Sequence, residues 1–139
     1  SHKIPIVFPM HPRTRNNLRK FGKLSVLENE SSIHMMEPLG YLEFVSLIGG
    51  SSLVITDSGG LQEETTSLGI PCLTLRENTE RPITITEGTN QLITDLSTLQ
   101  ISVDNALHNQ SIIEPKKPKY WDGKTAQRIV DAIIDCVER

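Results

Sequence analysis

Short apolar runs alternate with amphipathic segments along almost the whole chain. This alternation is typical of parallel strands that are joined by crossover helices. Strands are expected at residues 4–8, 32–36, 53–56, 71–75 and 91–94. Helices are expected at residues 13–21, 40–48, 60–68, 96–108 and 123–137. The pattern therefore predicts an α/β domain with a doubly wound, Rossmann-like parallel sheet in three layers.

The length and composition exclude several classes of protein. A chain of 139 residues can bury enough surface to fold as one domain without metals or disulfides. With 37% apolar and 22% charged residues, and no apolar run of membrane-spanning length, it reads as an ordinary soluble domain with no membrane partner. The two cysteines have no metal or disulfide spacing, which indicates a reducing compartment and predicts a cytoplasmic protein without a metal site.

The charge distribution argues against a nucleic-acid partner. The net charge is −3, although residues 1–24 hold six basic residues and no acidic one. A solvated basic helix face is the default interpretation of this segment.

The chain opens almost directly on the apolar run 4–8. We therefore expect a fragment of a longer protein.

The turn at residues 57–60 is the most informative candidate site, because ligands of open parallel sheets bind beyond the carboxyl ends of the strands. It follows the third predicted strand. Gly59 and Gly60 would let backbone N–H groups at a helix start approach a phosphate. The alternative is purely structural: Ser58 caps the helix, Gly59 supplies a positive φ, and Gln62 with Glu63 completes a capping pattern.

Two further residues could complete a nucleotide site at this edge. Glu63 and Glu64 are placed in the first helical turn, where the helix dipole favours acidic residues whatever the function. Glu64 could accept hydrogen bonds from both hydroxyls of a ribose. Arg81 could clamp the phosphates, or it could be a surface arginine paired with Glu80 or Glu77.

His11 and Phe44 are weaker candidates. His11 could donate a proton, contact a phosphate or lie at a domain interface, although a lone histidine beside a proline is more often a surface or packed residue. Phe44 is by default a core residue of its predicted helix. No Ser-His-acid set, metal-spaced cluster or pair of catalytic carboxylates is found, so no self-contained active site is predicted.

Six segments in a fixed order resemble the C-terminal domain of non-hydrolysing UDP-N-acetylglucosamine 2-epimerases. They are residues 37–41 (EPLGY), 57–64 (DSGGLQEE), 69–76 (GIPCLTLR), 79–82 (TERP), 87–90 (EGTN) and 122–126 (DGKTA). The resemblance implies that residues 1–139 form the UDP-binding, C-terminal half of a two-domain GT-B-type fold.

The resemblance also implies roles for particular residues. Ser58, Gly59 and Gly60 match the turn that holds the diphosphate, and Glu64 matches the carboxylate that holds the ribose. Arg81 matches an arginine that contacts the substrate. Phe44 and the backbone near Leu39 match the uracil site, and His11 matches a segment that faces the interdomain cleft.

The family interconverts UDP-N-acetylglucosamine and UDP-N-acetylmannosamine by eliminating UDP and adding it back to the other face. The resemblance places the catalytic acids in an N-terminal domain that is absent from this chain. It implies that the parent is a homodimeric isomerase without a cofactor and that the isolated chain is inactive. Two alternatives stay open. One is a stand-alone UDP-sugar binding module, and the other is the C-terminal half of a GT-B-type glycosyltransferase.

Overall fold

The structure is a computed structural model that describes residues 4–108 and 118–137. The chain divides into two compact units, Ser1–Phe44 and Val45–Arg139. The boundary between them falls inside helix α3 (Tyr41–Gly49). Each unit has its own parallel sheet.

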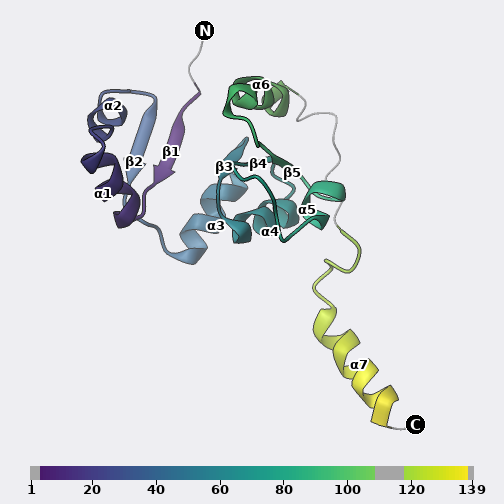
Figure 1. Cartoon of the computed structure of the whole chain (residues 1–139). Coiled ribbons are helices and arrows are strands. Elements are labelled where there is room, and N and C mark those ends of the chain that lie inside the picture. Colours follow the sequence, from purple (N-terminus) through teal and green to yellow (C-terminus); the bar gives the residue numbers. More distant parts are fainter. Residues whose placement is uncertain (1–3, 109–117, 138–139) are drawn as a thin grey trace. The chain divides into compact units, whose positions relative to one another are not determined.

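The first unit is a parallel strand pair with a helical crossover (Figure 1). Strand β1 (Ile6–Pro9) pairs with β2 (Ile33–Met36), and Ile6 lies opposite Ile33. Helices α1 (Pro12–Lys20) and α2 (Leu24–Glu28) connect the two strands. Met10 and Leu24 are the buried apolar side chains of this unit.

The second unit contains a parallel sheet in the order β3-β4-β5. The strands are β3 (Val54–Thr56), β4 (Cys72–Thr74) and β5 (Asn90–Leu92). All three residues of β4 are buried, as expected for a central strand that is covered on both faces. Helices α4 (Gly59–Leu68) and α6 (Leu99–His108) lie on opposite sides of this sheet in Figure 1, which gives three layers.

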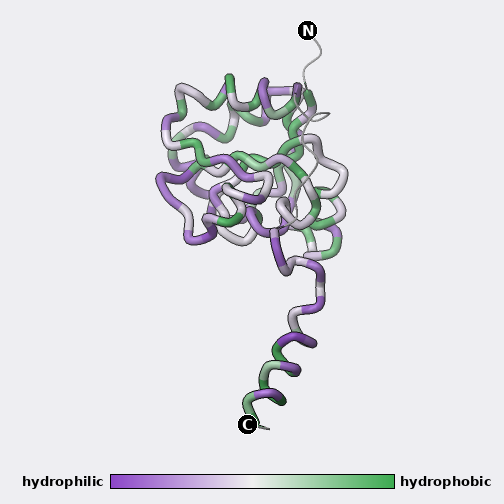
Figure 2. The backbone as a smooth tube through the Cα atoms, turned by 90° about the vertical axis from the view of Figure 1, so that its right-hand side faces the viewer, coloured by the Kyte–Doolittle hydropathy of each residue, from purple (hydrophilic) through white to green (hydrophobic). Residues whose placement is uncertain are grey.

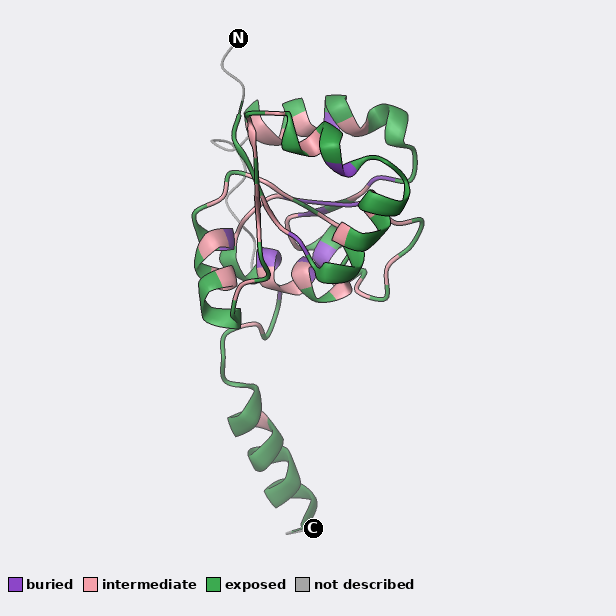
Figure 3. Cartoon of the chain, turned by 90° about the vertical axis from the view of Figure 1, so that its left-hand side faces the viewer, coloured by how far each residue is buried: buried purple, intermediate pink, exposed green. Residues whose placement is uncertain are grey.

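Three shorter or more remote helices complete the second unit. Helix α5 (Ile83–Thr86) precedes β5, and the 3-10 helix η1 (Leu96–Thr98) leads into α6. Helix α7 (Thr125–Val137) carries both hydrophilic and hydrophobic residues (Figure 2). None of its residues is buried (Figure 3). None of the described helices has the length and apolar character needed to cross a membrane.

The core of the second unit is unusually polar. Its buried apolar side chains are Ile48, Cys72, Leu73 and Ile93. Its buried polar side chains are Gln62, Thr65, Thr66, Thr74, Thr84, Asn90 and Ser102. Burial without compensation would cost each polar group a few kcal/mol, roughly 1–3, so their hydrogen-bond partners decide whether this core is stable.

The predicted α/β class with parallel strands is confirmed, and each predicted strand and helix is found within a few residues of its expected position. The strands form two sheets, β1-β2 and β3-β4-β5, where one sheet was predicted. Helices α2 and α5 were not predicted, because five and four residues are too few to show helical periodicity. The predicted end of α4 is confirmed, since Gly69 adopts a left-handed conformation with φ 73°.

Candidate functional site

The turn after β3 is built as a helix start with free donors. Ser58 is the N-cap of α4 in an extended conformation, and its N–H donates to Thr56 Oγ1 over 3.0 Å. Ser58 therefore occupies the N-cap position that the structural alternative predicts, but its hydroxyl makes no capping hydrogen bond. Because the first N–H groups of a helix have no acceptor within it, the groups at Gly59 and Gly60 can receive an anion.

Gly59 lies against the side chain of Arg81 and does not have a positive φ. Among the described residues, the glycines with positive φ are Gly22, Gly69 and Gly123, so the proposed positive φ at Gly59 is wrong. A Cβ atom at position 59 would instead lie 2.9 Å from Nη1 of Arg81. The guanidinium of Arg81 therefore lies directly against the turn.

Arg81 is held beside the turn by exposed ion pairs. Its Nε lies 2.9 Å from Glu63 Oε2, and its Nη1 lies 3.5 Å from Glu80 Oε2. The hydrogen bond to Glu63 raises the pKa of Arg81, so the side chain stays charged. The predicted alternative of a pair with Glu80 is thus partly correct, but the nearer carboxylate is Glu63.

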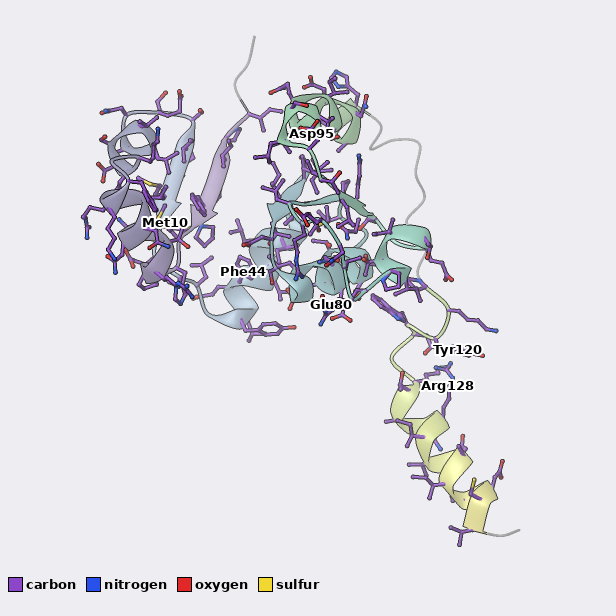
Figure 4. The ribbon with its side chains drawn as sticks, in the orientation of Figure 1. Met10, Phe44, Glu80, Asp95, Tyr120 and Arg128 are labelled. Atoms are coloured by element: carbon purple, nitrogen blue, oxygen red, sulfur yellow. The ribbon has the colours of Figure 1, made fainter. Side chains whose placement is uncertain are left out.

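A second arginine lies close to the same turn. Nη1 of Arg76 would be 3.7 Å from a Cβ atom at Gly59, and both terminal nitrogens of Arg76 donate to Glu80 over 3.3 Å. A backbone hydrogen bond within Glu80, and then the charge of Arg76, lower the pKa of Glu80. Figure 4 labels Glu80 beside helix α4. These pairs are exposed and cost little to exchange, so a phosphate group could replace the carboxylates as the partner of either arginine.

Glu64 lies in α4 near this turn, and its carboxylate has no partner among the described residues. Glu63 and Glu64 lie beyond the first turn of α4, which has no acidic residue, so their predicted position is wrong by about one turn. Glu64 is half-buried, and its carboxylate has no ion pair or hydrogen bond with any residue in 4–108 or 118–137. Gly60 and Glu64 are four residues apart and share one helix face. The two residues therefore lie on the same side of α4, and the binding role of Glu64 stays a prediction.

His11, Leu39 and Phe44 belong to the first unit. His11 is exposed and is the N-cap of α1, where its Nδ1 accepts the N–H of Arg13 over 3.2 Å. His11 is thus a surface residue, which agrees with its alternative interpretation, but its capping contact was not predicted. Phe44, labelled in Figure 4, is half-buried, and so is Leu39, while Ile48 is the buried residue of α3. The binding roles of the three residues stay predictions.

Three residues shape this site in ways that the sequence did not predict: Gln62, which was expected only to complete a capping pattern, Arg76 and Asn90. Gln62 is fully buried and receives hydrogen bonds from Thr79 and Asn90. An arginine at the end of β4 and a polar residue on the buried face of α4 were the available signals. Within the described residues, no three His, Cys, Asp or Glu side chains lie together as a metal site would require.

Comparison with known proteins gives a consistent family. The family model for UDP-N-acetylglucosamine 2-epimerase matches residues 1–134. A UDP-N-acetylglucosamine 2-epimerase from Methanococcus maripaludis is 42% identical over 135 residues, and one from Methanocaldococcus jannaschii is 41% identical over 125 residues. These matches cover 93% and 90% of this chain, but only 35% and 34% of the relatives. The chain thus spans about a third of the length of the curated relatives it matches.

Solved structures show the same relationship. The structure of the UDP-GlcNAc 2-epimerase from Methanocaldococcus jannaschii matches with a TM-score of 0.82 and 40% identity, covering 94% of this chain and 36% of that one. The same enzyme in complex with UDP-GlcNAc and UDP matches with a TM-score of 0.79 and 39% identity, covering 94% and 35% of the two chains.

Proposed function

The chain belongs to the UDP-N-acetylglucosamine 2-epimerase family, and on that premise we propose that its second unit binds the diphosphate of UDP between the start of α4 and Arg81. The observation that carries this proposal is the guanidinium of Arg81 against Gly59, where a Cβ atom would lie 2.9 Å from Nη1. Free N–H groups, the positive end of a ten-residue helix and a charged fork then converge on one place.

The neighbouring groups extend the site toward the nucleoside. The hydroxyl of Ser58 is exposed and free of a capping bond, so it can donate to a phosphate oxygen. The carboxylate of Glu64 can accept hydrogen bonds from the two ribose hydroxyls. From the family alone, we further propose that Phe44 and the backbone at Leu39, which belong to the first unit, bind the uracil and that His11 of the same unit contacts the nucleotide sugar.

The whole-protein activity that fits this site is the interconversion of UDP-N-acetylglucosamine and UDP-N-acetylmannosamine by elimination and re-addition of UDP. In that reaction the present residues hold the leaving UDP: donors at α4 and Arg81 stabilise the negative charge that develops on the diphosphate. Acid and base groups for the sugar carbons would come from beyond this chain. The family favours this activity over a glycosyltransferase half or a stand-alone binding module.

The setting of the parent protein is proposed on the same basis. A cytoplasmic, homodimeric enzyme that supplies precursors of surface polysaccharides fits the family and the unpaired cysteines, since Cys72 and Cys136 are free. Burial raises the pKa of the Cys72 thiol, which makes it an inert core residue.

Replacing Glu64 with glutamine tests the ribose contact. The change keeps the size of the side chain but removes a charge-assisted pair of hydrogen bonds, so UDP binding is expected to weaken by about 1.5–3 kcal/mol. Pyrophosphate binding should stay the same, because it does not involve the ribose. Titration calorimetry of UDP, 2′-deoxy-UDP and pyrophosphate on the parent chain and the variant measures this difference.

Two comparisons make the test specific. The Glu64→Gln variant should distinguish UDP from 2′-deoxy-UDP less than the parent chain does. Asp104→Asn is the matched control, because it also removes one carboxylate from a helix of the second unit, α6, away from the turn. Equal discrimination by the parent chain and Glu64→Gln would return Glu64 to a purely structural role.

A further inference from the structure

The backbone N–H and the backbone carbonyl of Arg81 are both hydrogen-bonded to threonine side chains. Its N–H donates to Thr79 Oγ1 over 3.0 Å, and its carbonyl accepts from Thr84 Oγ1 over 2.8 Å. Arg81 lies in the loop between β4 and α5. The two threonines therefore set the path of the main chain from which the guanidinium extends.

Both threonines are tied to two buried amide side chains. Thr79 Oγ1 donates to Gln62 Oε1 over 2.6 Å. Asn90 Nδ2 donates to the same Gln62 oxygen over 3.0 Å and to Thr84 Oγ1 over 3.2 Å. Gln62 belongs to the first half of α4 and Asn90 to the start of β5. Through its Oε1 atom, Gln62 thus links α4 to the loop that carries Arg81 and to strand β5.

The network continues into the centre of the sheet and is rigid. Thr74 Oγ1, at the end of the central strand β4, donates to Asn90 Oδ1 over 2.6 Å. Gln62, Thr74 and Thr84 are fully buried, and Asn90 is 5% exposed. A buried network in which the amide groups find partners fixes a single arrangement, because any other would leave a polar group unpaired in the core.

We propose that Gln62, Thr79, Thr84 and Asn90 are positioning residues that hold Arg81 over Gly59 in advance of ligand binding. The inference rests on the proposed function, in which Arg81 binds the diphosphate. Holding the arginine in place before binding spares the ligand the cost of ordering the loop. In this proposal, the buried polar side chains of the second unit support its diphosphate-binding site.

The positioning role can be tested by measuring the affinities of the 139-residue chain for two probes, UDP and uridine. Thr79→Val removes both the donor to Gln62 and the acceptor of the Arg81 N–H while keeping the shape of the side chain. UDP affinity should fall about fivefold, the size expected from losing one or two ordinary hydrogen bonds. Uridine affinity should not change, because uridine has no phosphate. Thr79→Ser keeps the hydroxyl and should restore UDP binding.

Thr65→Val is the matched control. Thr65 is fully buried in the same helix, and its hydroxyl donates to the α4 carbonyls of Leu61 and Gln62 and also contacts the Cys72 thiol. Among the described residues, it has no hydrogen bond to the loop of Arg81. The Thr65→Val change should lower the urea midpoint and leave the ratio of UDP affinity to uridine affinity unchanged. Thr84→Val, which removes the side-chain hydrogen bond to the carbonyl of Arg81 and leaves the one from the Thr84 backbone N–H, is a second test variant should Thr79→Val not fold.

The outcomes separate the two proposals. A lower UDP-to-uridine ratio in Thr79→Val or Thr84→Val, with rescue by Thr79→Ser and no effect of Thr65→Val, supports the positioning role. If Arg81→Met lowers the ratio and both threonine variants leave it unchanged, the positioning role is wrong and the proposed function stands. If Arg81→Met also leaves the ratio unchanged, Arg81 does not bind the diphosphate and both proposals are overturned.

Discussion

Replacing Arg81 with methionine is expected to weaken UDP binding by about tenfold and to leave the fold intact. A charge-assisted hydrogen bond is stronger than a neutral one, but solvent screens the partly exposed side chain of Arg81, so a loss of affinity larger than about tenfold is not expected. The ion pairs with Glu63 and Glu80 are exposed, so their loss should leave the urea midpoint nearly unchanged. Titration calorimetry and urea denaturation measure the two quantities.

Arg128→Met is the control for the charge that this change removes. Arg128 is also partly exposed, and it pairs with Asp122 before α7 and not with the turn at Gly59. Its loss should leave UDP affinity within about twofold, since a distant charge acts only through screened attraction. Equal weakening by the two variants would show that net charge, and not the position of Arg81, governs binding.

Replacing Gly88 with alanine is expected to cost about 2–3 kcal/mol of stability or more. The added Cβ atom would lie 2.5 Å from the carbonyl oxygen of Thr84 and 2.6 Å from Oγ1 of Thr66. Thr66 is buried and the carbonyl belongs to α5, so neither atom can move without displacing packed structure. Urea denaturation followed by circular dichroism gives the change in midpoint.

Gly60→Ala is the matched control for added bulk. A Cβ atom at Gly60 would have no other atom within 4 Å, and Gly60 does not have a positive φ. Its stability should stay the same or rise by about 0.4–1 kcal/mol, because alanine restricts the unfolded chain. Matching midpoints for Gly88→Ala and Gly60→Ala would contradict the packing at the start of β5.

Local pattern was enough to predict the strands, the longer helices and the turn at Gly59 and Gly60. Apolar periodicity and glycine punctuation are properties of neighbouring residues, and Gly69 ends α4 for the conformational reason that its sequence position indicates. The same local view placed Arg81 and Glu64 near the turn, because strand ends in a parallel sheet meet at one edge.

The contacts that hold the site could not be predicted in this way. Gln62 and Asn90 are 28 residues apart in sequence, and only the folded sheet brings them together. Gly59 was predicted to supply a positive φ, but its φ is not positive, and the group that lies against it is the guanidinium of Arg81 from another segment. Local reasoning likewise paired Arg81 with Glu80 or Glu77 and missed the nearer carboxylate of Glu63, which reaches it from another element.

Amide chemical-shift mapping of the chain during a UDP titration tests the central claim most directly. If the diphosphate lies on the start of α4, the amide signals of Gly59, Gly60 and Arg81 should move first and saturate with one dissociation constant. Uridine should leave these signals nearly unmoved, since it carries no phosphate. Shifts confined to the basic helix α1 (Pro12–Lys20), with Gly59 and Gly60 unaffected, would contradict the proposed diphosphate site.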